Sequence, residues 1–264
     1  MRAASAGKAA ADARALTGAL GVLAVLLGWT ALALTVLRNG GAVPTPAAVV
    51  RGWLSDGWRF YSPHVSTTLS EAGRGFVWGN LAAVAAASVV VLIPVTERVV
   101  LQLGIASFCL PVIALAPILA AVFKGTTSMA ALAALSVFFT TLVGTLLGLR
   151  AADPLSMDLV RAYGGGRWQQ LRRVQLMAAL PGLFTSLKIA APAAVLGAII
   201  GEFLGGERGL GIAMVVAQQS LNVPRTWGLA LASGAVAGLG YALLGLVGRM
   251  VTPWAAASTG RGNR

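Results

Sequence analysis

Long apolar runs alternate with short polar or basic segments along this chain. A transmembrane helix needs roughly 20 mostly apolar residues, and six runs of about this length occur: 16–37, 75–96, 99–123, 125–149, 183–204 and 226–248. All six are rich in Ala, Gly, Leu and Val, which lets helices approach closely in lipid. The pattern therefore predicts an all-α integral membrane protein with six transmembrane helices, formed by one domain over residues 1–264.

The basic residues flank these runs unevenly, and their distribution predicts an orientation. If the N-terminus is cytoplasmic, 13 Lys and Arg residues fall inside and 7 fall outside, which is the bias that membrane insertion selects. We therefore expect a cytoplasmic N-tail at 1–15, an outer loop at 38–70, a cytoplasmic loop at 150–182 and a cytoplasmic C-tail at 252–264. The first apolar run is too long for the core of a signal peptide, so we expect a retained helix.

The composition supports a lipid environment and excludes several classes of site. Hydrophobic residues make up 57% of the chain and charged residues 11%, whereas soluble domains carry about 25% charged residues. The net charge of +12 does not indicate nucleic-acid binding, because the basic residues flank apolar runs. Cys109 and His64 are each the single residue of their type. We therefore expect neither a metal site nor a cofactor bound by this chain.

The expected outer loop contains a cluster of aromatic residues: Trp53, Trp58, Phe60 and Tyr61. Aromatic side chains at headgroup depth usually anchor a protein in the membrane interface. We favour this interpretation over a specific docking surface.

The segment 153–181 predicts two short helices outside the membrane. Asp153 and Pro154 are typical of a helix start, and the three glycines at 164–166 are typical of a helix end. A second helix is expected through Trp168 and Leu176, and Pro181 is expected to mark the entry to the fifth span. The basic and apolar residues fit a segment lying on anionic lipid as well as they fit a surface that binds a partner.

This segment resembles the EAA loop in the permease subunits of ATP-binding-cassette importers. Asp158 stands at the family's Glu position, Leu159 and Val160 at its two Ala positions, and Gly164 at its Gly. Val174 and Leu176 match the later Ile and Leu, and Met177 replaces a proline. Residues 43–46, 201–204 and 209–211 resemble counterparts in the nitrate, sulfonate and taurine importer permeases. The resemblance extends from about Pro44 to Trp254.

The resemblance implies the partners and the cargo. Two permease copies, a homodimer, would form the pathway in a prokaryotic plasma membrane, and an external binding protein would deliver the solute. Two ATPase subunits would bind ATP and Mg, because this chain lacks the G-x-x-x-x-G-K-[ST] loop. We therefore expect the chain itself not to be an enzyme. The branch implies a small anion such as a sulfonate, taurine or nitrate; the alternative is a pyrimidine or riboflavin-like vitamin precursor.

The candidate site residues form two groups. The resemblance implies that the coupling loop contacts the ATPase through Asp158, Leu159, Val160, Arg161, Tyr163, Gly164, Gly165, Trp168 and Arg172. For the translocation pathway the candidates are Glu202, Pro111 and Pro117, because charges in spans are often functional and prolines permit kinks. For Glu202 we favour a structural ion pair with Arg208 or Lys124 over contact with the cargo.

Two other functional classes fit the sequence less well. An ion-coupled secondary transporter would need carboxylates or histidines in the middle of its spans, and the apolar runs contain almost none. An integral-membrane enzyme would need catalytic polar residues gathered at one membrane face, and no such set is visible in the sequence.

Overall fold

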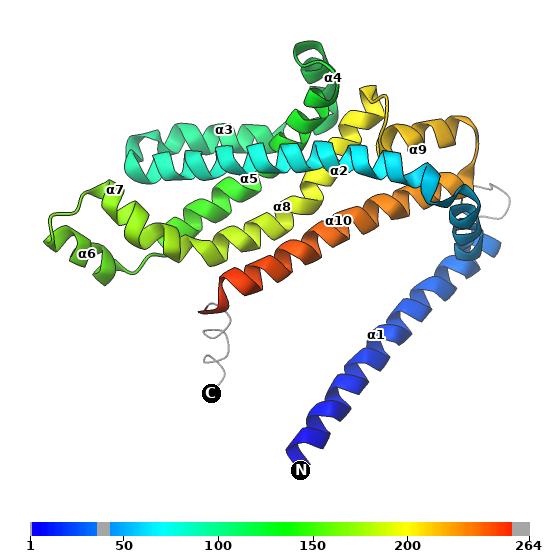
Figure 1. The fold of residues 1–264 in the computed structure, drawn as a ribbon, viewed down its shortest axis with the longest axis horizontal. Coiled ribbons are helices and arrows are strands. Elements are labelled where there is room, and N and C mark those ends of the chain that lie inside the picture. Colours follow the sequence, from blue (N-terminus) through cyan, green and yellow to red (C-terminus); the bar gives the residue numbers. More distant parts are fainter. Residues whose placement is uncertain (1, 36–42, 255–264) are drawn as a thin grey trace. The chain divides into compact units, whose positions relative to one another are not determined.

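The computed structural model describes residues 2–35 and 43–254, and helices account for nearly all of them (Figure 1). The expected C-tail therefore lies mostly outside the described residues, as does the start of the expected outer loop. The elements are α1 (Arg2–Leu34), α2 (Pro46–Leu92), η2 (Pro94–Thr96), α3 (Glu97–Cys109), α4 (Val112–Val122), α5 (Thr126–Arg150), α6 (Pro154–Ala162), α7 (Arg167–Gln170), η3 (Leu171–Gln175), α8 (Leu176–Gly205), α9 (Leu210–Gln219) and α10 (Val223–Val251).

The expected all-α architecture is confirmed, whereas the count of six spans is not. Four helices of the described residues are long and apolar enough to cross a membrane, or five if a bent pair counts as one span. The first apolar run forms part of α1, where the apolar stretch is the shorter Leu20–Leu34. The third run is not one straight span, because α3 and α4 meet at an angle of 102°.

Pro111 explains the bend between α3 and α4. A proline disfavours helical geometry in the residue before it, and Leu110 is extended with φ −69° and ψ 127°. Pro111 itself is extended and precedes the first residue of α4. Pro117, the other proline of this run, lies inside α4. Only the first of the two expected kinks therefore divides a helix.

Most of the expected outer loop is helical. Helix α2 starts at Pro46 and includes the second apolar run, so residues 46–70 form a helix that continues into the span. A break occurs at Gly57, whose φ of 66° and ψ of 169° are not helical. This backbone region is accessible almost only to glycine. Gly57 therefore changes the direction of the chain inside α2.

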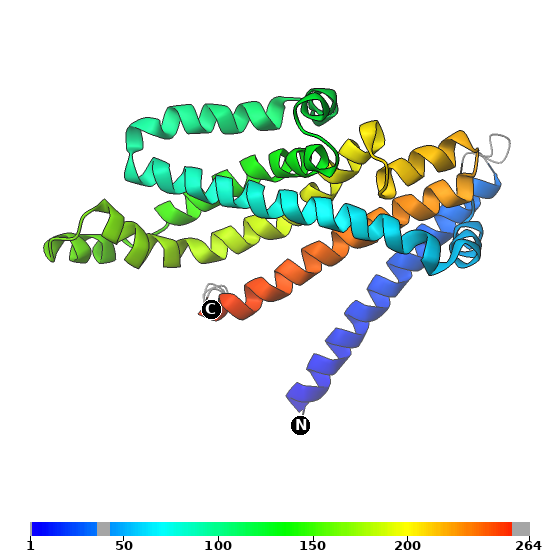
Figure 2. The same ribbon diagram turned by 45° about the horizontal axis from the view of Figure 1, so that its top comes forward.

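The described chain forms two compact units. One unit comprises Met1–Trp58 with Val216–Gly228, and the other comprises Arg59–Val215 with Leu229–Arg264. The second unit contains α3 to α8 and the longer parts of α2 and α10. Its most extensive helix pair is α5 with α8, which run side by side (Figure 2).

Small residues bring α5 and α8 of the second unit together. A methyl group on Gly197 of α8 would lie only 2.8 Å from Cα of Ala133 on α5. Helix α2 joins this core through a polar contact in which Thr141 Oγ1 donates a hydrogen bond to Asn80 Oδ1 at 2.5 Å. Close approach and interhelical hydrogen bonds are the main attractions between helices in lipid, so these contacts hold α2 and α8 against α5.

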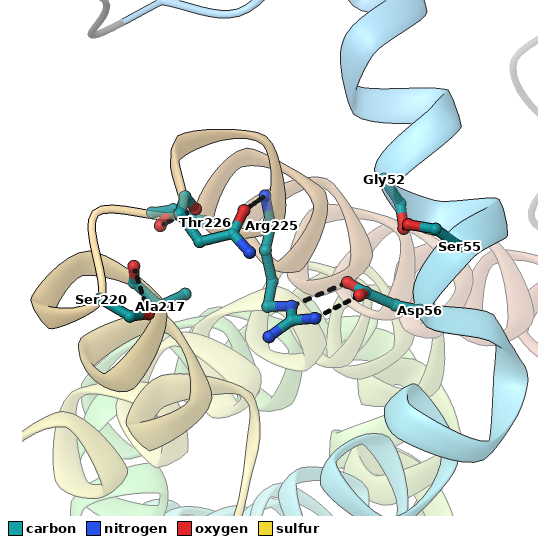
Figure 3. Close-up of polar contacts among 8 residues, drawn as sticks. Gly52, Ser55, Asp56, Ala217, Ser220, Arg225 and Thr226 are labelled. Atoms are coloured by element: carbon teal, nitrogen blue, oxygen red, sulfur yellow. Dashed lines mark hydrogen bonds and ion pairs between the residues drawn. The ribbon is translucent and has the colours of Figure 1, made fainter.

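The first unit is held by an ion pair between Asp56 of α2 and Arg225 in the first turn of α10 (Figure 3). The Arg225 guanidinium donates to both carboxylate oxygens of Asp56, with Nε at 2.9 Å from Oδ2. The Asp56 side chain is only 8% exposed, and Gly52, one helical turn earlier, faces Pro224. A bidentate pair fixes orientation as well as distance.

Candidate functional site: the α6–α7 segment and the Glu202 turn

Helix α6 begins as the sequence predicts, with Asp153 as its N-cap. The Asp153 carboxylate accepts hydrogen bonds from the Ser156 hydroxyl at 2.8 Å and from the backbone N–H groups of Ser156 and Leu155. These bonds, led by that of the Ser156 hydroxyl, hold the pKa of Asp153 below its ordinary value. The cap is therefore charged at neutral pH, and its contribution to stability is lost as the pH falls through the lowered pKa.

The end of α6 is a glycine-dependent turn. Gly165 N–H donates to Val160 O at 2.8 Å, and Gly164 N–H donates to Arg161 O at 2.8 Å. This pair of bonds is the Schellman arrangement, which needs a left-handed residue after the helix. Gly164 supplies it with φ 77°. A side chain on Gly165 would collide with Val160, so both glycines are required by the geometry.

The second helix of the segment is not a separate short helix, contrary to expectation. Residues Arg167–Gly205 form one continuous helix that includes α7, the π-helical turn η3 and α8. Pro181 lies inside α8 and marks no entry to a new span. The expected elbow is therefore a joint between α6 and a single helix that continues through the apolar run.

Two side chains tie this joint to the rest of the second unit. Arg167 Nη1 donates a hydrogen bond to Leu92 O at the end of α2, at 3.1 Å. Gln170 is 4% exposed, and its Nε2 lies 3.5 Å from Met157 O of α6. Leu171, at the start of η3, packs in the core with Leu149 of α5. The base of the segment, formed by Arg167, Gln170 and Leu171, is thus fixed. Its tip, formed by the side chains of Leu159, Tyr163 and Trp168, is exposed.

The tip carries large apolar side chains that the second unit leaves uncovered. Leu159 is 59% exposed, Tyr163 85% and Trp168 61%. Beside them, Asp158 and Arg161 form the ion pair that their spacing predicts, with 3.2 Å between Oδ1 and Nη1. The remaining candidates divide into two sets: Arg172 and Gly164 are exposed, whereas Val160 and Gly165 face each other inside the turn.

Glu202 lies at the other end of α8. The prediction that it forms an ion pair with Arg208 or Lys124 is wrong. Its side chain is fully buried. Oε1 accepts a hydrogen bond from Thr68 Oγ1 at 2.6 Å, and Oε2 accepts one from Gly211 N–H at 2.7 Å. Leu210 N–H donates in turn to Thr68 Oγ1 at 2.9 Å. A buried carboxylate gains more from these fixed donors than from the exposed side chains of Arg208 or Lys124, so Glu202 holds the turn between α8 and α9.

Glu71 is a member of this cluster that the sequence analysis missed. It is 1% exposed and its carboxyl is paired with that of Glu202, while its Oε2 has no hydrogen-bond partner among the described residues. His64, Thr68 and Glu71 follow one another at helical spacing on one face of α2. His64 Nδ1 accepts from Gly209 N–H at 3.3 Å. The spacing of these three residues is a signal for one helical face that is visible in the sequence, and the expectation of a loop over 38–70 hides it.

The two prolines proposed for the pathway lie on the bent pair of helices. Pro111 and Pro117 are both exposed in the second unit. Pro111 produces the bend described above, and Pro117 lies in the middle of α4. Neither proline makes a contact that assigns it to the pathway.

Comparison with known proteins assigns the family. Residues 75–257 match the family described as "binding-protein-dependent transport system inner membrane component". The chain is 33% identical to a riboflavin transport system permease protein of Chloroflexus aurantiacus over 81% of each chain. It is 28% identical to a formylaminopyrimidine transport permease protein of Halalkalibacterium halodurans, over 80% of this chain and 85% of the relative. A putative aliphatic sulfonates transport permease protein of Bacillus subtilis is 26% identical over 47% of this chain and 45% of its own length.

The matched region contains both structural features described above, the α6–α7 joint and the buried Glu202 turn. The chain therefore belongs to the binding-protein-dependent transport system inner membrane component family, as a multi-pass permease subunit of an ATP-binding-cassette importer.

Proposed function

We propose that the α6–α7 segment is the surface through which a separate ATPase subunit drives this permease. The observation that carries the proposal is the combination of an exposed apolar tip with a fixed base. Leu159, Tyr163 and Trp168 are more than half exposed, whereas Arg167 and Gln170 bind the base to α2 and α6. Force applied to such a tip moves α8 and is not absorbed by a flexible loop.

The same proposal defines the assembly. Two copies of the chain form the pathway, two ATPase subunits bind ATP and Mg on the cytoplasmic side, and an external binding protein delivers the cargo. The α6–α7 segment and both termini then lie in the cytoplasm, and the membrane is the plasma membrane of a prokaryote. The excess of basic residues in the segments assigned to that side supports this orientation.

Trp168 is the residue expected to contribute most to docking, because buried aromatic side chains dominate interfaces. We expect Trp168→Ala to weaken ATPase binding by about 2 kcal/mol. Cargo uptake into proteoliposomes is then lost while ATP hydrolysis by the ATPase persists. The matched control is Trp78→Ala, because Trp78 is also exposed, at 68% against 61% for Trp168, and lies in α2. Wild-type ratios of uptake to hydrolysis in Trp168→Ala would refute the docking role.

For the cargo we propose a heteroaromatic vitamin or vitamin precursor. The two relatives that cover about four fifths of this chain are named for riboflavin and formylaminopyrimidine transport. The sulfonate relative covers less than half of it. The small anion expected from the branch resemblance is therefore the second candidate.

Uptake by the reconstituted importer with its binding protein separates the two cargo classes. Radiolabelled riboflavin or formylaminopyrimidine should accumulate in an ATP-dependent manner, and excess taurine, sulfonate or nitrate should not compete. Omitting the binding protein is the control, and it should abolish accumulation. ATP-dependent uptake of taurine with no uptake of either heteroaromatic compound would reject this cargo without affecting the docking proposal.

A further inference from the structure

A cavity of about 600 Å³ lies in the second unit between the first half of α8 and the second half of α10. Its lining includes Lys188 of α8 and Arg249 of α10, with the rings of Phe184 and Tyr241. The cavity is on the half of α8 that is joined to the α6–α7 segment, and it extends to Thr252 beyond the last residue of α10. It is separate from both sites described above.

Two glycines of α10 create the space in which the α8 side chains lie. A methyl group on Gly248 would come within 3.2 Å of Cβ of Phe184, and one on Gly245 within 3.3 Å of Cδ of Lys188. The Lys188 stem therefore passes directly against the α10 backbone. Its Nζ lies 4.7 Å from the centroid of the Tyr241 ring. The lysine is thus held by its neighbours in one place.

The cavity carries positive charge without a protein counter-charge. Its lining contains two cations and no carboxylate. The ion pairs among the described residues involve Arg150, Arg161 and Arg225, and neither cavity cation takes part in one. Contact with an aromatic ring stabilises an ammonium group, but it leaves the charge in place. Because a charge near lipid is costly unless it is paired, an anion from outside the chain would be stabilised here.

We propose that this groove binds the phosphate of an anionic phospholipid, with Lys188 and Arg249 sharing its negative charge. Basic pockets between transmembrane helices near one membrane surface recognise such headgroups. Arg249 is in the last turn of α10, where a headgroup is expected if α10 spans the membrane, and Lys188 contacts Gly245 one helical turn further in. Leu246, which lines the same cavity and is 56% exposed, offers an apolar surface for an acyl chain. The two cations therefore match the charged headgroup of a lipid, and the apolar lining matches its acyl chain.

The test compares lipid binding in detergent by the wild-type full-length chain and by variants of it. Lys188→Gln/Arg249→Gln removes the two cavity charges, and Lys124→Gln/Arg98→Gln removes one exposed Lys and one exposed Arg outside the cavity. Phosphatidylglycerol retained after delipidation is measured by mass spectrometry and compared with phosphatidylcholine. We expect the cavity variant to bind phosphatidylglycerol on the order of tenfold more weakly, and the control variant to bind it as the wild type does.

A second measurement does not depend on the folding of the cavity variant. Phosphatidylglycerol, but not phosphatidylcholine, should raise the thermal unfolding midpoint of the wild-type chain. Lys188→Arg and Arg249→Lys should keep this shift because they keep the charge. Equal shifts with both lipids, or an equal loss of binding in the control variant, would overturn the proposal. Displacement of the lipid by inorganic phosphate or riboflavin at low concentration would also overturn it, because the site would then recognise a soluble ligand.

Discussion

At the scale of single residues, the least expected feature is the contact between two buried carboxyl groups, those of Glu71 and Glu202. Two ionised carboxylates cannot remain buried in contact unless a proton or a cation lies between them. Glu202 accepts hydrogen bonds from Thr68 and Gly211, whereas Oε2 of Glu71 has no partner in the described part of the chain. The arrangement assigns the role of acceptor to Glu202 and leaves Glu71 to carry the proton.

A pair of amide substitutions tests this assignment. Glu71→Gln retains a neutral donor and should leave the thermal stability in detergent close to that of the wild type. Glu202→Gln replaces an acceptor oxygen by an NH2 group facing N–H and O–H donors, and should cost about 1–3 kcal/mol. Differential scanning fluorimetry of both variants provides the comparison. Equal destabilisation by the two changes would show that no proton is held on Glu71.

The candidate site could be predicted where local sequence determines local structure. Asp153 and Gly164 adopt the cap conformations expected for their residue types, and Asp158 pairs with Arg161 as the spacing predicts. The partners of Glu202 could not be predicted in the same way. Thr68 is 134 positions away from it, and only the packing of α2 against α8 brings the two together.

At the scale of elements, helix α2 shows how one residue divides a long helix. Its 47 residues would make a rod of about 70 Å at 1.5 Å per residue, far longer than a membrane span needs. The positive φ at Gly57 breaks this rod next to the Asp56–Arg225 ion pair. The part of α2 that precedes Gly57 can therefore adopt its own direction.

Two glycines of α2 provide a matched test of this break. Neither Gly57 nor Gly73 has any atom within 4 Å of the position of an added methyl group, so crowding does not contribute. Gly57→Ala should be destabilising by about 1–3 kcal/mol because its φ and ψ are disfavoured for alanine. Gly73→Ala lies in regular helix and should be stabilising by about 0.5–1 kcal/mol. Opposite shifts in the unfolding midpoint are expected, and a stabilising Gly57→Ala would mean that α2 is continuous.

At the scale of the whole molecule, hydrophobic patterning predicted the class of fold but not how each apolar run is folded. The runs at 125–149 and 183–204 form α5 and most of α8, whereas the run at 99–123 is divided at Pro111. Hydropathy measures transfer of side chains into lipid. Hydropathy does not report the backbone restriction that a proline imposes on the preceding residue, here Leu110, so a continuous apolar run need not form a continuous helix.

The proposed assembly predicts that this chain associates with itself. Co-expression of a tagged and an untagged copy in equal amounts with the ATPase should allow the tag to recover roughly half as much untagged as tagged chain, because dimers with two tags are recovered as well. Mixing the two copies after separate purification is the control, and it should recover little. If the pull-down contains the ATPase but no untagged copy, the homodimer is refuted and a heterodimer of two different permeases takes its place as the proposal.

The π-helical turn Leu171–Gln175 has a consequence for how the length of this chain can change. A π turn holds one residue more than the α-helix it interrupts. Losing one residue there would relax the turn to α-helix and leave the side chains on either side in phase. The same deletion in the middle of α8 would rotate the residues beyond it by about 100° and move buried residues such as Ala198 out of the core. We therefore expect a single-residue gap between relatives to be tolerated at this turn, in the helix that continues from the α6–α7 segment.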